Sequence, residues 1–198
     1  GLLPRANLSG SEAAYSLDYS QPQSATARGW LQRVRQEVKR AAVLNLPWQL
    51  VLDDIRRNGQ RIWQSLPLPE QQCFLQHLRP WWDVHRYRIA PQVSQVLSQL
   101  QASGQLSLRA ARLIAAEPAD DALRLTLRLR GADQEVCEVD KVIVTTGPAH
   151  NALLDSNPLL SQLQGDGVIQ PDALALGIRV NALSQAVNTQ GEASPRLY

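Results

Sequence analysis

The chain has 198 residues, of which 44% are hydrophobic, and its formal net charge is +2. This size and composition are typical of a globular protein with one substantial core or two small ones. The sequence has no block of like charge and no apolar run near the roughly 18 residues of a membrane span, which argues against nucleic-acid and membrane partners. Cys73 and Cys137 lie far apart and form no CxxC motif. We therefore expect reduced thiols in a cytoplasmic protein and no dithiol redox centre.

Residues 1–25 are polar and loop-like, whereas residues 26–104 predict a block of about four helices. The first helix is expected to begin after Thr26, because threonine is a suitable N-cap residue. The second follows Pro47 and continues to about residue 66, weakened in its middle by Gly59, which costs about 1 kcal/mol relative to alanine. The face of the first helix that is expected to meet water carries Arg33, Glu37, Lys39 and Arg40.

Two shorter helices complete this block. The third covers residues 67–78 and is started by Pro69, and the fourth covers residues 90–104 and is ended by Gly104. The apolar side of the fourth helix carries Val93, Val96, Leu97 and Leu100.

The segment Leu78–Pro91, "LRPWWDVHRYRIAP", holds the densest cluster of functional side-chain types in the chain. Such a cluster could form an aromatic and cationic pocket for a planar or anionic ligand. Packing between helices is the simpler interpretation, with the tryptophans clamping helices together and Asp83 pairing locally with Arg86 or with the neighbours of Tyr87. Histidine is the side chain best suited to proton transfer under physiological conditions, so His85 is the best acid-base candidate if the cluster is catalytic. If the cluster is a site, the catalytic candidates are His85, Asp83 and Arg86, and the substrate-side candidates are Trp81, Trp82 and Arg88.

After Gly104 the hydrophobic period changes to two, which predicts strands. Residues 105–117 predict one or two short strands. Residues 122–131 predict a half-exposed antiparallel strand that turns at "GADQ" into a further strand at residues 135–140. In residues 122–131 leucines alternate with Arg124, Thr126, Arg128 and Arg130. We prefer arginines directed toward water over an arginine comb for phosphate.

The run Val142–Thr145 is β-branched and lacks polar alternation, so it predicts a strand buried on both faces of a parallel sheet. Gly147 would let backbone approach a ligand closely, and Pro148 would fix the exit direction. Ligands of open α/β sheets lie at the carboxyl ends of strands, so this exit could touch a dinucleotide. A core strand with a tight exit is the alternative. The predicted cofactor contacts are Thr145, Thr146, Gly147 and Pro148.

The last part of the chain carries weaker signals. Residues 149–167 are polar and predicted to be partly helical, residues 168–181 are strand-like, and residues 185–194 predict a turn-rich hairpin.

Residues 104–148 resemble the part of two-dinucleotide-domain flavoproteins in which a β-meander and an Asp, here Asp140, precede a hydrophobic strand that closes on Thr-Gly. Together with "GLLP", "LRPWWDVHRYRIAP" and "TTGP", the sequence resembles the YdhS-like family of FAD/NAD(P)-binding proteins. The resemblance implies the central part of an FAD-dependent, NAD(P)H-using oxidoreductase acting on a small molecule, with a monooxygenase as a reasonable subclass. Its fold would be α+β, a helical block and an antiparallel β-meander leading into a dinucleotide-domain strand.

The resemblance also implies a division into domains. Residues 1–25 would leave a nucleotide-binding domain, residues 26–104 would be a helical insertion, residues 105–150 would be the meander and nucleotide-domain strand, and residues 151–198 would return toward an FAD domain. No GxGxxG motif, which places a pyrophosphate at a helix N-terminus, occurs in the chain. We therefore expect these residues to bind neither FAD nor NAD(P)H tightly by themselves. The absence of methionine and the mid-element ends favour a piece of a longer protein, and a homodimer is one assembly to test.

A helical protein-interaction module without catalytic activity of its own is the alternative function. A hydrolase is not supported by the sequence. His77, His85 and His150 make no HxH or HExxH spacing, and no GxSxG follows a predicted strand. No metal site is predicted.

Overall fold

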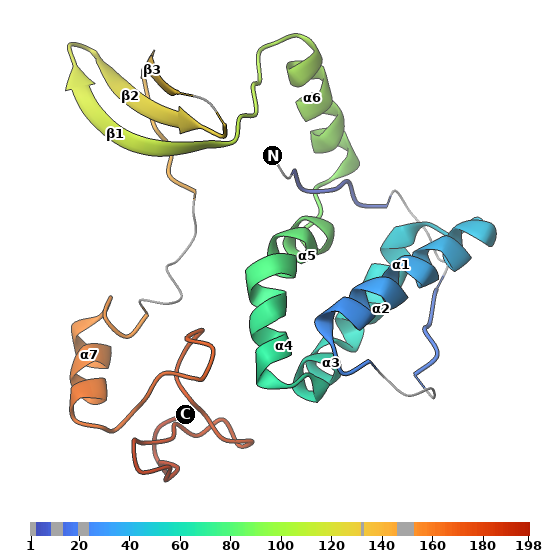
Figure 1. Ribbon diagram of the computed structural model, residues 1–198, viewed down its shortest axis with the longest axis vertical. Coiled ribbons are helices and arrows are strands. Elements are labelled where there is room, and N and C mark those ends of the chain that lie inside the picture. Colours follow the sequence, from blue (N-terminus) through green and yellow to red (C-terminus); the bar gives the residue numbers. More distant parts are fainter. Residues whose placement is uncertain (1–2, 9–13, 20–23, 132, 146–152) are drawn as a thin grey trace. The chain divides into compact units, whose positions relative to one another are not determined.

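The computed structural model describes residues 3–8, 14–19, 24–131, 133–145 and 153–198 (Figure 1). These residues form helices and a three-stranded antiparallel sheet, so the α+β class predicted from the sequence is confirmed.

The chain divides into two compact units, which are described separately. The first comprises Gly1–Asp18, Val34–Asn58 and Leu78–Thr145, and the second comprises Tyr19–Arg33, Gly59–His77 and Thr146–Tyr198.

The helices begin where the sequence provides starting residues. Helix α1 (Ala27–Val43) follows Thr26, whose Oγ1 accepts the Gly29 N–H at 3.1 Å, as an N-cap should. Helix α2 (Trp48–Arg57) follows Pro47. Both predicted starts are therefore confirmed.

The prediction that Glu37 faces water is wrong, because Glu37 is only 8% exposed. Tyr15 of the N-terminal segment lies against this side of α1, and its hydroxyl donates to Glu37 Oε2 at 2.7 Å. The second buried acid, Asp54 of α2, accepts the Leu17 N–H at 3.0 Å. Two buried carboxylates thus hold the N-terminal segment at Tyr15 and Leu17. The hydrogen bonds that they accept offset the cost of removing their charges from water.

The single helix predicted after Pro47 is two helices, α2 and α3 (Gly59–Ser65). Asn58 between them has φ −96° and ψ 4°, which departs from helical geometry. Its side chain donates at 3.0 Å to the Asp54 carbonyl, which also accepts the Asn58 N–H at 3.2 Å, so Asn58 closes the end of α2 with both its side chain and its backbone. An asparagine before a glycine therefore ends the helix instead of only weakening it.

The third predicted helix continues further than expected. Helix α4 (Leu68–Cys73) passes through a π-helical turn, Phe74–Leu78, into helix α5 (Arg79–Arg86). Helix α6 (Pro91–Ala102) then follows, and Gly104 adopts φ 76° beyond its end, which confirms the predicted stop. Val93 and Val96 of α6 remain about half exposed.

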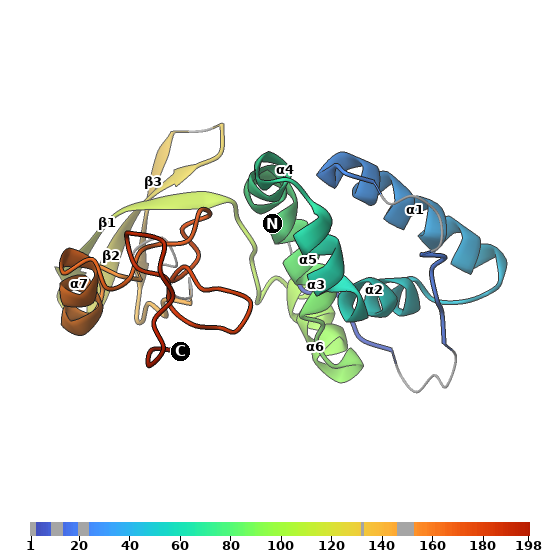
Figure 2. The ribbon, with the colours of Figure 1, turned by 90° about the horizontal axis from the view of Figure 1, so that it is seen from below.

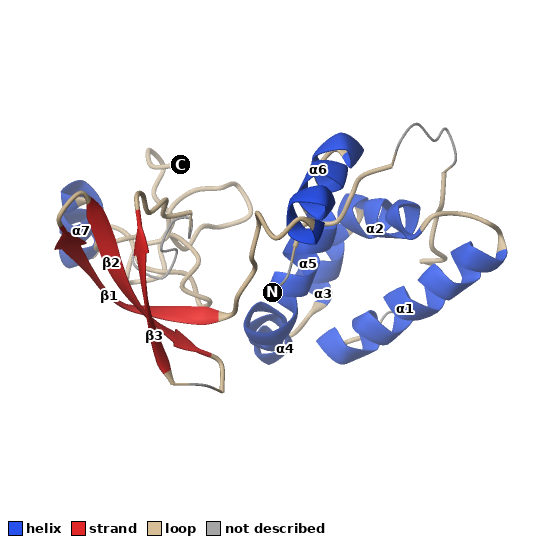
Figure 3. Cartoon of the chain, turned by 90° about the horizontal axis from the view of Figure 1, so that it is seen from above, coloured by secondary structure: helices blue, strands red, loops and turns tan. Residues whose placement is uncertain are grey.

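The sheet consists of β1 (Ala111–Ala119), β2 (Ala122–Leu129) and β3 (Gln134–Val139), in the order β1-β2-β3 (Figure 3). Both pairs are antiparallel, and a register shift interrupts β1 between Leu113 and Ala115. The predicted alternation on β2 is confirmed, since its leucines are half-buried and its arginines are exposed.

The predicted buried strand at Val142–Thr145 is wrong. These residues form no strand and are all exposed, Ile143 by 83% and Val144 by 75%. A strand needs a neighbour for its backbone N–H and C=O groups, and among the described residues none pairs with this run.

The second unit has its own small core. Asn157 caps α7 (Pro158–Gly165), with Oδ1 accepting the Leu159 N–H at 2.9 Å. The strand-like prediction for residues 168–181 is wrong, because this stretch makes single β-bridges and turns (Figure 2). Residue 191, a glycine at φ 86°, turns the predicted hairpin near the C-terminus. The core residues of this part are Leu154, Ile169 and Ala186, with Leu160, Leu163, Ile178 and Leu197 packed against them.

Candidate ligand site between helices α2 and α5

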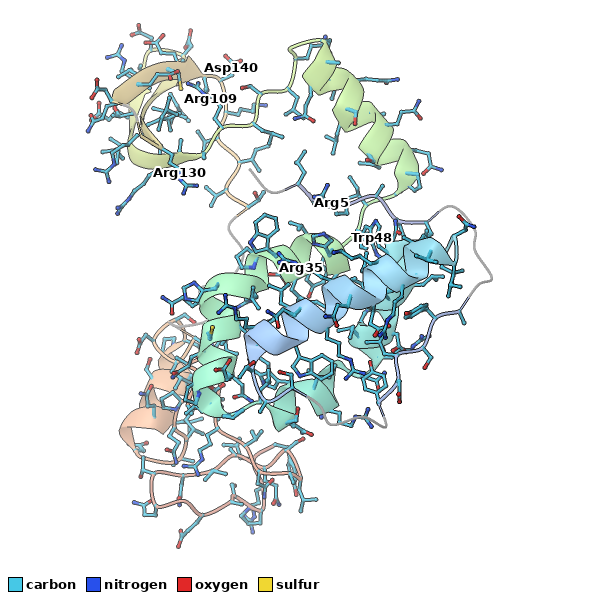
Figure 4. The ribbon with its side chains drawn as sticks, turned by 45° about the vertical axis from the view of Figure 1, so that its right-hand side comes forward. Arg5, Arg35, Trp48, Arg109, Arg130 and Asp140 are labelled. Atoms are coloured by element: carbon cyan, nitrogen blue, oxygen red, sulfur yellow. The ribbon has the colours of Figure 1, made fainter. Side chains whose placement is uncertain are left out.

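Helices α2 and α5 of the first unit pack together and bring an aromatic pair into contact. Trp48 is the first residue of α2, and His85 lies in the last turn of α5. Their rings meet edge to face, with centroids 5.2 Å apart and planes at 78°. This geometry is favourable for aromatic rings, and it fixes the plane of the His85 imidazole. Trp48 is marked in Figure 4.

The hydrogen bond of His85 defines its tautomer. Nδ1 lies 2.6 Å from the Trp81 carbonyl oxygen. A carbonyl oxygen can only accept, so Nδ1 carries the proton, and in the neutral ring Nε2 is the atom left to accept one. His85 thus has the arrangement of an oriented general base or acid, and its catalytic role stays a prediction.

Arg88 follows α5 and forms an ion pair with Asp53 of α2 through Nη2 and Oδ1. The Arg88 side chain is only 9% exposed, whereas that of Asp53 is 37% exposed. The second terminal nitrogen of Arg88, Nη1, is buried and has no hydrogen-bond partner among the described residues. Buried polar atoms nearly always have a partner, so this guanidinium nitrogen is a candidate for an acceptor that the described residues do not supply.

Two further buried polar atoms in this region lack partners. Gln49 donates through Nε2 to the Ala6 carbonyl at 3.4 Å, while its Oε1 is buried and unpaired. Gln49 and Asp53 are four residues apart on α2 and so lie on one face of the helix, the face that meets Arg88. Arg86 donates to the Tyr87 hydroxyl at 3.0 Å, and its Nε is buried without a partner.

The N-terminal segment holds the end of α5 in place. Arg5 donates its N–H to the Val84 carbonyl at 2.9 Å and accepts the Ile89 N–H at 3.0 Å. Asn7 donates to the Ile89 carbonyl at 2.8 Å. Arg88, which precedes Ile89, is therefore positioned by backbone hydrogen bonds on its C-terminal side and by Asp53 at its head group.

The remaining predicted residues of the cluster differ in their partners and burial. Asp83 pairs with Arg79, at 3.7 Å between Oδ2 and Nε, and not with Arg86 as predicted. Both arginines are helical neighbours of Asp83, but the Arg86 guanidinium donates to the Tyr87 hydroxyl instead. Trp81 is 53% exposed, and Trp82 is half-buried. The site thus contains His85, Arg86 and Arg88 of the predicted set.

Sequence reasoning missed the contribution of α2, namely Trp48, Gln49 and Asp53. A signal was present in "DD" at residues 53–54, since two acids within an apolar helix indicate partners of opposite charge. No local pattern, however, could show that these partners come from a segment 35 residues later in the chain.

The predicted dinucleotide contacts are not brought into a site by the described residues. Thr145 is exposed, and Thr146, Gly147 and Pro148 lie outside the described residues. The strands that are described form an antiparallel sheet without the parallel strand and glycine-rich turn of a dinucleotide site. The described residues therefore provide no dinucleotide site, and contacts to FAD or NAD(P)H would have to come from residues outside them.

Within the described part of the chain no group of three or more His, Cys, Asp or Glu residues could hold a metal ion. No helix there is long and apolar enough to cross a membrane. No family model, curated protein or solved structure matches the chain. The class defined by the structure itself is that of an α+β protein with a partly buried aromatic and cationic cluster.

Proposed function

We propose that the chain is part of an FAD-dependent, NAD(P)H-using oxidoreductase, and that its helical block binds the small-molecule substrate. The resemblance of Leu78–Pro91 and of the β-meander to the YdhS-like flavoproteins supports the reaction class. The observation that carries the substrate role is the buried guanidinium of Arg88, which has one nitrogen bound to Asp53 and the other without a partner.

The chemistry of this site favours a planar anion. Arg88 Nη1 would donate to a carboxylate or similar oxygen, and a charge-assisted bond of this kind is stronger than a neutral one. Trp48 supplies an aromatic surface, and His85 Nε2 can accept a proton from the ligand or return one. Gln49 Oε1 would accept a hydrogen bond from a hydroxyl or amino group.

Each described residue has a defined task in this proposal. Arg88 binds the charge of the substrate, Trp48 orients its ring, and His85 moves a proton at Nε2. Hydride transfer would be supplied by the nicotinamide and flavin, which the described residues do not hold. A monooxygenase is the subclass that we propose. Cys73 and Cys137 are both free, in keeping with a cytoplasmic enzyme.

A first experiment tests the reaction class. The protein produced from its complete native gene should show the visible absorbance of bound flavin and should oxidise NADH or NADPH. The 198-residue chain alone should show no micromolar affinity for FAD or NADPH by calorimetry. A complete protein without flavin, or micromolar binding by the chain alone, would contradict the proposal.

A second experiment tests the substrate role of Arg88, with benzoate as the simplest planar anion. Benzoate should raise the melting temperature of the chain, and Arg88→Met should weaken its binding by at least about tenfold, because the charge-assisted bond is lost. Arg79→Met is the matched control, since Arg79 lies on α5 and pairs with Asp83 at the surface. Equal affinity of the Arg88 and Arg79 variants would show that benzoate does not bind at Arg88.

One observation favours the alternative function of a protein-interaction module. Trp81 is 53% exposed and Tyr87 is 60% exposed, and exposed aromatic residues are enriched in interfaces. A partner captured by the chain and lost with Trp81→Ala, but retained with Arg88→Met, would favour that function over the enzyme.

A further inference from the structure

The sheet of the first unit carries a group of arginines that the α2–α5 site does not use. Arg112 of β1 and Arg128 of β2 are direct cross-strand partners, so their side chains start from the same face of the sheet. Arg130 lies just beyond the end of β2 and borders the same surface depression as Arg112 and Arg128. Arg130 is marked in Figure 4. All three side chains belong to exposed residues.

This arrangement is unfavourable unless an anion is nearby. Like charges directly opposite each other on neighbouring strands repel and destabilise a sheet. On β3 the partner of Arg128 is Gln134, which has no charge. Among the described residues, no carboxylate forms an ion pair with Arg112, Arg128 or Arg130.

The other end of the same face shows how this sheet neutralises an arginine. Arg124 lies between Glu117 of β1 and Glu138 of β3 in the cross-strand register. Its Nη2 is 3.0 Å from Glu138 Oε1. On β2, therefore, Arg124 has an acidic neighbour on each adjacent strand. Arg128, four residues later, has an arginine on β1 and a glutamine on β3 as its neighbours.

The arginine group also lines a hollow. An open depression of about 780 Å³ is bordered by Arg112, Arg128 and Arg130 together with Gly131 and Asp133. This volume lies within the range of small-molecule sites. Three guanidinium groups and one carboxylate leave its border with two net positive charges, and Gly131, at φ 74°, turns the chain beside it.

We propose that Arg112, Arg128 and Arg130 form a binding site for a phosphate-bearing anion with two or more negative charges. Guanidinium groups bind phosphate oxygens in a planar, two-pronged geometry, and a doubly charged anion between them removes the repulsion of the cross-strand pair. The site lies on the sheet and does not depend on the oxidoreductase role proposed above.

Inorganic pyrophosphate is the probe that tests the site, used with the whole chain. Pyrophosphate should bind in calorimetry at low ionic strength and should weaken as salt is added, because exposed charges are screened. Arg128→Gln should lower the affinity by at least about tenfold, since it removes the central guanidinium. Arg124→Gln is the matched control from the same strand and face, and it should change the affinity by less than about twofold.

Circular dichroism and thermal unfolding of both variants check that the sheet is retained. No pyrophosphate binding, or an equal loss of affinity in Arg124→Gln and Arg128→Gln, would overturn the proposal.

ADP distinguishes two sources of the anion. Tighter binding of ADP than of pyrophosphate supports the site and identifies a nucleotide, while equal affinities support the site and identify the phosphates alone. Binding of single-stranded nucleic acid without pyrophosphate binding would also overturn the proposal.

Discussion

Individual side chains fix the N-terminal segment more firmly than its polar sequence suggests. Tyr15 donates to Glu37 Oε2 at 2.7 Å, and Arg40 donates to Glu37 Oε1 at 2.8 Å. Both oxygens of the buried Glu37 carboxylate thus accept a hydrogen bond. Burial and the hydrogen bond to Glu37 raise the pKa of the Tyr15 hydroxyl to about 12.

Removal of the Tyr15 hydroxyl should therefore destabilise the fold in a pH-dependent way. Tyr15→Phe should lower the free energy of unfolding by about 1–2 kcal/mol near neutral pH, because one bond to a charged acceptor is lost. The raised pKa means that the folded state holds the proton more tightly than the unfolded state. The contribution is therefore full below about pH 10 and is lost as the pH rises through about 12.

Urea unfolding of the wild type and Tyr15→Phe at about pH 9 and about pH 11.5 measures this change. Tyr198→Phe is the control, because Tyr198 is 77% exposed and donates only to the Pro195 carbonyl. A difference between wild type and Tyr15→Phe that stays constant with pH would contradict the assignment.

Helix starts show how a local element depends on a single small residue. Helix α1 begins in a tight turn in which Ser24 Oγ accepts the Thr26 N–H at 3.2 Å. Gly29 passes so close to this turn that an added Cβ would lie 1.9 Å from Ser24 Oγ and 2.9 Å from Ser24 Cβ. At Gly59, the first residue of α3, an added Cβ would meet no atom within 4 Å.

The two glycines should consequently respond in opposite directions to alanine. Gly29→Ala should lower the free energy of unfolding by about 1–2 kcal/mol, since steric overlap outweighs the helix propensity of alanine. Gly59→Ala should raise it by about 0.5–1 kcal/mol through the lower entropy of the unfolded chain. Thermal unfolding measures both, and Ser24→Gly should restore the stability of Gly29→Ala. Stabilisation by Gly29→Ala would show that the turn moves freely.

At the scale of the whole molecule, each of the two units has its own set of buried apolar residues. In the first unit Val51 of α2 is fully buried, and in the second unit Ile169 is fully buried. Ile169 packs in a cluster with Leu154 and Ala186.

Substitutions in these two sets should have different local effects. Ile169→Ala should cost about 2–4 kcal/mol and increase hydrogen exchange of residues 154–197, because it leaves a cavity in their core. Val51→Ala should increase exchange of α2 instead. Hydrogen-exchange mass spectrometry measures both, and loss of α2 protection in Ile169→Ala would show that the two sets unfold together.

Part of this architecture could be predicted from short-range signals. Thr26, Pro47 and Gly104 marked helix ends correctly, because capping, a missing N–H and a positive φ act within one turn. The alternation of leucine and arginine on β2 was equally informative. The split at Asn58 and the π-helical turn at Phe74–Leu78 were not predicted, since apolar periodicity does not distinguish a continuous helix from an interrupted one.

The candidate site was only half predictable. The sequence showed that His85, Arg86 and Arg88 were unusual, but not that Trp48 and Asp53 lie against them. The strand expected at Val142–Thr145 failed for the same reason. A run of β-branched residues favours a strand, but the strand forms only where a neighbouring strand pairs with its backbone.

The sequence by itself determined the helical block, the β-meander and the arginine-bearing face, because these depend on residues within a few positions of one another. The tertiary structure alone decided which charges are compensated. Asp53 meets Arg88 across 35 residues, Glu138 meets Arg124 across the sheet, and Arg112 faces Arg128 without an acid between them. Coulomb energy depends on distance in space, and chain folding sets that distance independently of separation in the sequence.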